Sequence, residues 1–162
     1  MKRWFVGILL VLLTAGWSQA FSPPEPGKPA PDFTATALDG QRYSLDDDLK
    51  GKKPVLLIFW ATWCEVCKEK WPEIEDLYKT YGDRMQFLAI NVGVNDNLDG
   101  VKAYVEQRDL KLPVVFDEDS EISVSFWVNM TPLDILIDKN GTIVYKDVKL
   151  PSRMELERVL AK

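Results

Sequence analysis

The sequence predicts an α/β sandwich in which helices flank a central mixed β-sheet. Segments with the apolar pattern of buried strands alternate along the chain with segments of helical periodicity. Two strand-like segments around a Lys-Asn-Gly turn then form a hairpin, and a last helix closes the chain. With 162 residues, of which 46% are hydrophobic and 28% charged, the chain is long enough for one domain with a substantial core.

The first twenty residues have the features of an export signal. Lys2 and Arg3 give a positive start, and a largely apolar segment, Trp4–Trp17, follows them. This segment has 14 residues, fewer than the roughly 20 that span a bilayer comfortably. A Ser-Gln-Ala sequence ends at Ala20 and predicts cleavage there. An uncleaved N-terminal membrane anchor is the alternative, and it would be the protein's only direct contact with a membrane.

Both alternatives predict an extracytoplasmic, periplasmic location. Outside the cytoplasm, glutathione does not hold neighbouring thiols reduced, so a close cysteine pair would oxidise. The net charge of −5, from 20 basic and 25 acidic residues, and the absence of a basic patch argue against nucleic-acid binding. The chain has no histidine, which excludes histidine-based acid–base catalysis and most zinc or haem ligation.

The N-terminal part of the remaining chain is predicted to be a linker followed by the domain. Residues 21–31 contain five prolines in eleven positions and predict an extended linker, so the domain is placed at residues 32–162. Asp39-Gly40, between two short strand-like segments, predicts an N-terminal β-hairpin extension. The polar connector 45–53 has room for one helical turn, and its acidic residues are expected to face solvent.

The central elements are predicted from their apolar patterns. The continuous apolar segment "VLLIFW", Val55–Trp60, is typical of a strand buried on both faces. Helical periodicity then continues from Cys64 to Tyr81, and Gly82 ends it. The further predictions, in chain order, are a buried strand at 86–91, a helix at Leu98–Arg108, a short strand at 112–117, a short helix at Asp119–Val128, a hairpin of 133–138 and 142–147, and a helix that Pro151 opens.

The only two cysteines, Cys64 and Cys67, lie in "WCEVCKEKWP" at the start of the first long helix. Their spacing is nearly one helical turn, so the Cα atoms should lie roughly 5–6 Å apart, within disulfide range. Unpaired N–H groups and the helix dipole favour a thiolate at Cys64, whereas Cys67 lies one turn deeper. The pattern predicts thiol–disulfide exchange, in which Cys64 attacks and Cys67 resolves. Glu65 and Val66, between them, are assigned to the substrate-facing surface and should tune the reduction potential.

Three alternative roles for the cysteine pair are less consistent with the sequence. Two structural core cysteines would not need this spacing or a helix start. A purely structural disulfide that closes so short a loop would constrain the chain little. A zinc site would have only two ligands here and no histidine to complete it. We therefore predict no metal site and no cofactor.

The stretch "PAPDFTATALDGQRYSLDDDLKGKKPVLLIFWATWCEVC" resembles the opening of the thioredoxin-like TlpA/ResA family of exported thiol–disulfide oxidoreductases. The later stretch "MTPLDILIDKNGTIV" is similar to the cis-proline loop and hairpin of that fold, so the resemblance covers residues 29–162. It implies a thioredoxin-like fold, with Pro132 as the cis-proline against the disulfide and the Thr131 backbone pairing with a substrate strand. It also implies protein thiol or disulfide substrates, a membrane thiol–disulfide electron donor, and reduction of protein disulfides, with cytochrome c maturation as one candidate pathway.

Two positions depart from the family pattern. Thioredoxins carry a buried acid where this chain has Ile58, and ResA-type proteins carry a glutamate where it has Lys70. Asp134, two residues after Pro132 in an apolar strand, is a candidate substitute, because a buried carboxylate is costly without a partner. We hypothesise that Asp134 accepts or relays the proton of Cys67, with Lys70 nearby. The alternative is an aspartate that faces solvent at a sheet edge.

Aromatic residues are expected to surround the cysteine pair. Trp63 is predicted to belong to an exposed substrate-docking surface, whereas Trp60 and Trp71 are expected in the core. Phe126 and Trp127 precede the predicted cis-proline loop on a helix; either could line the substrate groove, and one of them is expected in the core.

Two other functions remain as alternatives. A thiol peroxidase of the peroxiredoxin type needs a threonine three residues before its attacking cysteine, and the residue three before Cys64 is Ala61. A copper(I) chaperone could use the two thiolates as soft ligands. No histidine or methionine-rich segment supports that role.

Overall fold

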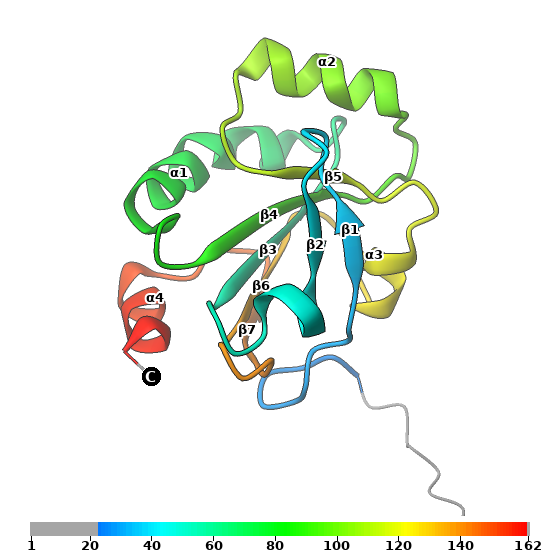
Figure 1. Cartoon of the computed structure of the whole chain (residues 1–162). Helices are drawn as coiled ribbons and strands as arrows, with labels where there is room; N and C mark the ends of the chain where they lie inside the picture. The colour runs from blue at the N-terminus through cyan, green and yellow to red at the C-terminus, as the bar shows by residue number, and fades with distance from the viewer. Residues whose placement is uncertain (1–22, 162) are drawn as a thin grey trace, which may run out of the picture.

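The computed structural model of the protein describes residues 23–161 and has a five-stranded mixed sheet as its centre (Figure 1). The strand order is β5-β4-β3-β6-β7, in which β3, β4 and β5 are parallel and β6 and β7 run antiparallel to their neighbours. The predicted mixed sheet with flanking helices is confirmed. The elements are β1 (Thr34–Thr36), β2 (Arg42–Ser44), η1 (Leu45–Leu49), β3 (Val55–Trp60), α1 (Glu65–Tyr81), β4 (Gln86–Asn91), α2 (Leu98–Arg108), β5 (Val114–Phe116), α3 (Glu121–Ser125), β6 (Leu133–Ile137), β7 (Ile143–Asp147) and α4 (Arg153–Leu160).

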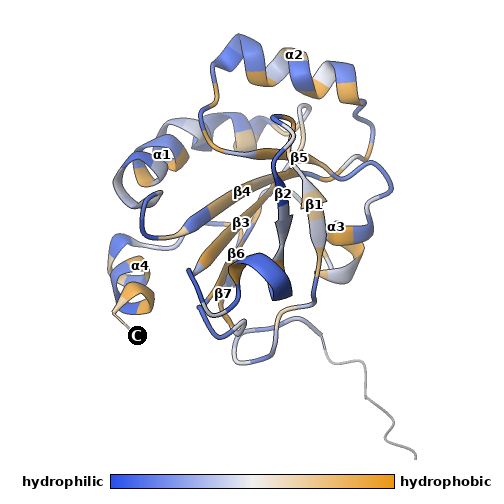
Figure 2. Cartoon of the chain, viewed as in Figure 1, coloured by the Kyte–Doolittle hydropathy of each residue, from blue (hydrophilic) through white to orange (hydrophobic). Residues whose placement is uncertain are grey.

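The central strand β3 is buried at every residue, as its continuous apolar sequence predicts. Figure 2 shows the apolar residues concentrated in the strands of this sheet. Because side chains alternate along a strand, Trp60 and Phe59 point to opposite faces. Trp60 packs against Trp71 of α1 and Tyr104 of α2, whereas Phe59 packs against Phe126, directly after α3. Helices α1 and α2 therefore cover one face of the sheet, and the α3 segment covers the other.

Helix α4 lies beside α1 on the same side of the molecule (Figure 1). Arg84, just after α1, forms an ion pair with Glu157 at 2.9 Å, and Arg153 pairs with Asp76. Exposed ion pairs of this kind contribute little free energy individually. The buried residues of α4, Leu156 among them, contribute more to holding the helix against the sheet.

The N-terminal hairpin forms where the Asp39-Gly40 sequence predicts it. Strands β1 and β2 pair antiparallel, and the Asp39 carboxylate accepts the backbone N–H of Gln41 in the turn. Gly40 has a φ of +88°, a left-handed conformation that suits glycine. A bridge from Ala37 to Val115 attaches the hairpin to strand β5 of the main sheet.

Two helices begin or end at residues other than those predicted. Helix α3 ends at Ser125 rather than continuing to Val128, because Trp127 adopts a φ of +55°, which is incompatible with a right-handed helix. The last helix begins at Arg153 rather than at Pro151. Ser152 caps it through a reciprocal pair of hydrogen bonds with Glu155, which fixes the first turn two residues later than predicted.

The end of the predicted proline-rich linker is hydrogen-bonded to the sheet. The Gly27 N–H donates to Ile143 O at 2.8 Å, the Ile143 N–H donates to Lys28 O at 2.9 Å, and the Ala30 N–H donates to Gly141 O at 2.8 Å. An edge strand such as β7 leaves backbone groups unpaired, and this segment pairs with both backbone groups of Ile143 at the start of β7. The predicted export signal at residues 1–20 lies outside the described residues. Within residues 23–161, no helix is long and apolar enough to cross a membrane.

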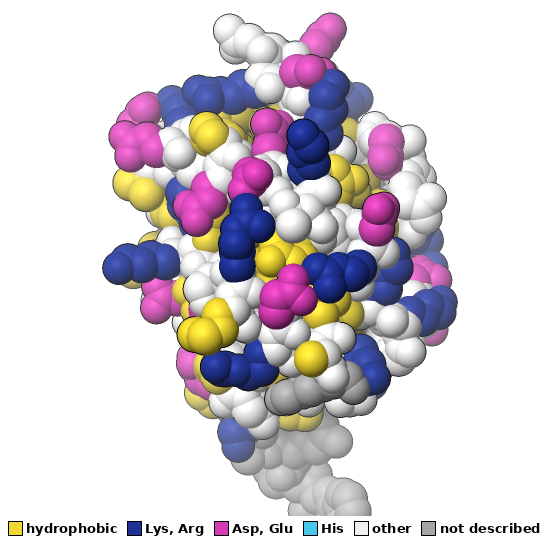
Figure 3. All heavy atoms as spheres, turned by 90° about the vertical axis from the view of Figure 1, so that its left-hand side faces the viewer, with side chains coloured by type: hydrophobic (Ala, Val, Ile, Leu, Met, Phe, Trp, Pro, Cys, Tyr) yellow, Lys and Arg dark blue, Asp and Glu magenta, His cyan; other side chains and the backbone are white. Residues whose placement is uncertain are grey.

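The molecular surface carries charges of both signs. Figure 3 shows lysine and arginine side chains interspersed with aspartate and glutamate on the face that α1 and α4 cover, with no large area of one sign. Such a mixed face does not provide the continuous basic surface that nucleic-acid backbones require.

Candidate active site at the start of helix α1

Cys64 and Cys67 form a disulfide at the N-terminus of α1. Their Cα atoms lie 5.2 Å apart, within the predicted range. Cys64 is the N-cap residue, and the backbone N–H of Cys67 donates to its sulfur at 3.2 Å. In the reduced protein this N–H and the positive end of the helix dipole would stabilise a Cys64 thiolate. Cys67 is more deeply buried than Cys64, so access favours Cys64 as the attacking sulfur.

The two residues between the cysteines face solvent. Glu65 is exposed and forms an ion pair with Lys68 at 2.6 Å, while the side chain of Val66 is 57% exposed. Both side chains are therefore accessible to a protein that approaches the cysteine pair. Their assignment to the substrate-facing surface remains a prediction.

The loop before β6 shares a hollow with the residue that precedes Cys64. The Thr131–Pro132 peptide bond is cis, and the Pro132 side chain is buried. Thr131 and Trp63, which directly precedes Cys64, line the same hollow of about 220 Å³. The hollow therefore lies between the cysteine motif and the cis-proline loop.

The walls of this hollow are largely apolar and contain no charged side chain. Trp63, half of which is exposed, forms one side, and Val94, Val124 and Met130 are exposed apolar residues around it. These residues place exposed apolar side chains on the surface next to the cysteine motif. Sequence reasoning identified Trp63 but missed the other three residues, because single apolar residues in loops and on a five-residue helix have no periodicity to distinguish them.

Asp134 is fully buried on β6 and does not face solvent at an edge. Its partner across the strands is Ile58 of β3, so its side chain lies on the face that α1 covers. Lys70 Nζ donates to Asp134 Oδ2 at 2.5 Å and to Val148 O at 3.0 Å. Lys70 lies one helical turn after Cys67, so the ion pair connects Asp134 to the helix that carries both cysteines.

The carboxyl of Asp134 is not fully satisfied. Its Oδ1 atom is buried and has no hydrogen-bond partner. Burial raises the pKa of Asp134 to about 6, against the opposing attraction of the Lys70 ammonium. A carboxyl with this pKa exchanges protons close to neutral pH, as an acid–base group would need to do.

The aromatic residues divide between core and surface. Trp60 and Trp71 are buried as predicted, and the Trp71 Nε1–H donates to the Tyr104 hydroxyl at 3.0 Å. Phe126 is completely buried, whereas Trp127 is half exposed. Neither residue lies within helix α3, contrary to the expectation, because that helix ends at Ser125.

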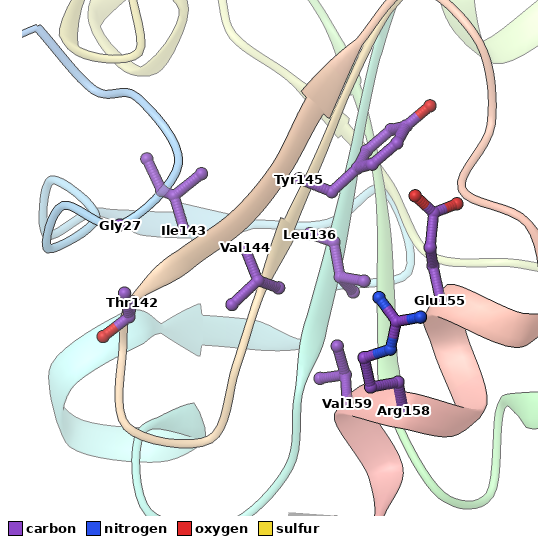
Figure 4. Close-up of a pocket in the computed structure, with 9 residues that line it drawn as sticks. All are labelled: Gly27, Leu136, Thr142, Ile143, Val144, Tyr145, Glu155, Arg158 and Val159. Carbon is purple, nitrogen blue, oxygen red and sulfur yellow. The ribbon is translucent and has the colours of Figure 1, made fainter.

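A second hollow, of about 320 Å³, lies between β7 and α4 (Figure 4). Figure 4 shows the carboxylate of Glu155 and the guanidinium of Arg158 on the same side of it. None of the residues that line it belongs to the cysteine motif or the cis-proline loop. It therefore has no evident part in chemistry at the disulfide. Among the residues that the structure describes, no group of three or more histidine, cysteine, aspartate or glutamate residues could hold a metal ion.

Residues 26–146 match the model of the AhpC/TSA family. The chain belongs to the AhpC/TSA family. It is 36% identical to the thioredoxin-like protein YneN of Bacillus subtilis, over 99% of this chain and 98% of that protein. It is 37% identical to the thiol-disulfide oxidoreductase ResA of Bacillus cereus, over 84% of this chain and 77% of that protein.

A solved structure shares the fold of this chain. A thio-disulfide isomerase from Thermus thermophilus superposes with a TM-score of 0.68 at 26% identity, over 85% of this chain and 95% of that one. The thioredoxin-like fold inferred from the sequence motifs is thereby confirmed. Fold, family and the Cys64–Cys67 pair together place this AhpC/TSA member among the thioredoxin-like thiol–disulfide oxidoreductases.

Proposed function

We propose that the protein is an exported reductase of protein disulfides. The observation that carries the proposal is the Cys64–Cys67 disulfide at the start of α1, adjoining an apolar hollow that ends at Thr131. Cys64 serves as the nucleophile, Cys67 as the resolving thiol, and Asp134 as the group that accepts or relays the proton of Cys67.

The first step is attack on the substrate. The Cys64 thiolate attacks one sulfur of a substrate disulfide; a Cys64–substrate bond forms, the substrate S–S bond breaks, and one substrate sulfur leaves as a thiolate. The Cys67 N–H, aimed at the Cys64 sulfur, and the helix dipole favour the thiolate that starts this step. The exposed Trp63, Glu65 and Val66 and the Thr131 backbone contact the substrate chain in this proposal.

The second step releases the substrate. Cys67 gives up its proton, attacks the Cys64 sulfur and re-forms the intramolecular disulfide, and the second substrate sulfur leaves as a thiolate. Two electrons have then passed from the cysteine pair to the substrate. Asp134, with a pKa of about 6, is largely ionised at neutral pH and can take the Cys67 proton, directly or through a relay.

Net reduction requires a source of electrons. A membrane thiol–disulfide donor would reduce the Cys64–Cys67 disulfide by the same exchange in the opposite direction. The export signal predicted at residues 1–20 would place the domain where such a donor is accessible, either free or anchored. Relatives named ResA are thiol-disulfide oxidoreductases, a name that agrees with this exchange chemistry in either direction. Cytochrome c maturation is the pathway we would test first.

Trapping in cells tests this function directly. The exported Cys67→Ala variant keeps the nucleophile and loses the resolving thiol, so it should accumulate mixed disulfides, which mass spectrometry identifies. A double variant that also carries Cys64→Ala is the matched control and should trap nothing. Trapped apocytochrome would support a role in cytochrome c maturation, whereas other trapped proteins would assign the reductase to a different pathway.

Three further measurements separate the alternatives. The wild type should reduce insulin when supplied with a dithiol; a protein that consumes peroxide but leaves insulin intact would be a peroxidase. Titration of the reduced protein with copper(I), with Cys67→Ser as control, tests the chaperone alternative. Alkylation of cell extracts should find Cys64 mostly reduced, and a fully oxidised pair would indicate an oxidase instead.

A further inference from the structure

The two residues before Cys64 are held by a loop far away in the sequence. Asp96, in the loop between β4 and α2, accepts two hydrogen bonds from Thr62: the backbone N–H donates to Oδ2 at 2.9 Å, and the hydroxyl donates to Oδ1. The Asn91 side chain also donates to Asp96 Oδ2, at 2.7 Å. One half-buried carboxylate thus accepts three hydrogen bonds, two of them from the turn that leads to the nucleophile.

The same loop contacts the next residue along that turn. The Trp63 indole N–H donates to the backbone oxygen of Val94 at 2.8 Å. The loop itself is anchored at two further points, where Asn91 Oδ1 accepts the Gly93 N–H at 3.0 Å and the Ser120 hydroxyl donates to Val92 O at 2.7 Å. Thr62 and Trp63 are therefore fixed to a loop that is itself fixed to the end of β4 and to the start of α3.

We propose that Asp96 is a positioning residue for the cysteine pair: by binding Thr62 it fixes the turn that sets where Cys64 and Trp63 are presented to a substrate. The inference deepens the proposed function and rests on it. Asp96 does not touch the reacting sulfurs, so its effect passes through Thr62. Hydrogen bonds to a carboxylate are stronger than neutral ones, which suits a residue that must hold a short irregular turn.

Two substitutions of Asp96 distinguish a positioning role from an effect of its negative charge, because they differ in the hydrogen bonds that they keep. In Asp96→Asn, the amide oxygen can accept from the Thr62 N–H and the Asn91 side chain, while the amide NH₂ can donate to the Thr62 hydroxyl, which also accepts. This variant keeps the geometry and removes the negative charge. Asp96→Ala removes both. If Asp96 acted only as a charge near Cys64, both variants would lower the pKa of the Cys64 thiol, because a nearby anion disfavours a thiolate.

The test measures the first attack alone, in a Cys67→Ala background. Reduced protein is mixed with a disulfide reagent that releases a coloured thiolate, and the second-order rate constant is followed across pH. We expect Asp96→Ala to react about 10- to 100-fold more slowly than the parent. Asp96→Asn should stay within about twofold of the parent, with the same Cys64 pKa in its pH profile.

Asp138→Ala is the matched control. Asp138 also organises a turn, by accepting the backbone N–H groups of Asn140 and Thr142 between β6 and β7, and none of these residues belongs to the cysteine motif. Asp138→Ala should lower the unfolding temperature and leave the rate constant of the folded protein unchanged.

The outcomes are distinct. Equal rates for Asp96→Ala and the parent would overturn the positioning role, and an equal change in both Asp96 variants would assign the effect to charge. A parent protein that fails to react with the disulfide at all would instead refute the proposed function.

Discussion

The sharpest consequence of the structure concerns the free energy of ionising Asp134. In the folded protein its pKa rises from 3.8 to about 6, because burial disfavours the charged form more than Lys70 favours it. Each pKa unit corresponds to about 1.4 kcal/mol. Ionised Asp134 therefore destabilises the folded state by about 3 kcal/mol relative to protonated Asp134.

The pH range of this effect follows from the two pKa values. Well below pH 4 Asp134 is protonated in both the folded and the unfolded chain, and no penalty exists. Between pH 4 and pH 6 the unfolded chain loses the proton first, so the stability contributed by Asp134 falls as the pH rises. Above about pH 7 the full penalty of about 3 kcal/mol applies.

Asp134→Asn isolates this penalty, because asparagine keeps the shape of the side chain and cannot ionise. The free energy of unfolding of the oxidised protein, measured with urea from pH 4 to pH 8.5, should be similar for both proteins at pH 4. At pH 8 the variant should be more stable by up to about 3 kcal/mol. Taking the difference at each pH cancels the titration of groups common to both proteins.

The exposed Asp99→Asn serves as the control and should show a difference close to zero throughout. If the free energy of unfolding of Asp134→Asn minus that of the wild type decreased as the pH rises, the attraction of Lys70 would outweigh the desolvation of Asp134. A difference independent of pH would show that Asp134 titrates normally. Either result would refute the assignment of Asp134 as an acid–base group with a raised pKa.

The remaining predictions concern the ion pair, the resolving step and the apolar hollow beside Trp63. Lys70→Met leaves the Asp134 carboxylate buried without its partner, so the free energy of unfolding at pH 8 should fall by about 3 kcal/mol, and by less at pH 5, in the same urea assay. Stopped-flow resolution of a preformed mixed disulfide should be slower in Asp134→Asn than in wild type, and identical pH profiles would leave Asp134 without a catalytic role. Val124→Glu places a charge on the apolar hollow, where the side chain is 69% exposed, and should raise the KM for insulin several-fold without changing the unfolding temperature. The equally exposed Met154→Glu on α4, away from the hollow, is its control and should change neither quantity.

The sequence predicts the parts of the structure that depend on local patterns. Strand β3 and helix α2 have the predicted ends, because continuous apolar sequence and helical periodicity are strong signals. The predicted end of α3 is wrong, because Trp127 adopts a φ of +55°, and no local sequence pattern signals a positive φ at a tryptophan. The spacing of the cysteines likewise fixes their Cα separation, whereas nothing local to Thr62 identifies Asp96 as its partner.

The two departures from the family pattern, Ile58 and Lys70, both lie next to Asp134 in the structure. Asp134 of β6 lies directly opposite Ile58 of β3, so the carboxylate occupies the strand next to the one that holds the acid in thioredoxins, on the same face. Lys70, at the position where the family resemblance implies a glutamate, forms an ion pair with Asp134. A glutamate at position 70 would place a second negative charge beside a buried carboxylate, which would disfavour ionisation of both. The buried carboxylate of Asp134 on β6 thus needs a positive charge at position 70 on α1, and Lys70 supplies it. A single change that restored the family residue, Lys70→Glu, would therefore destabilise the protein unless Asp134 were made neutral as well.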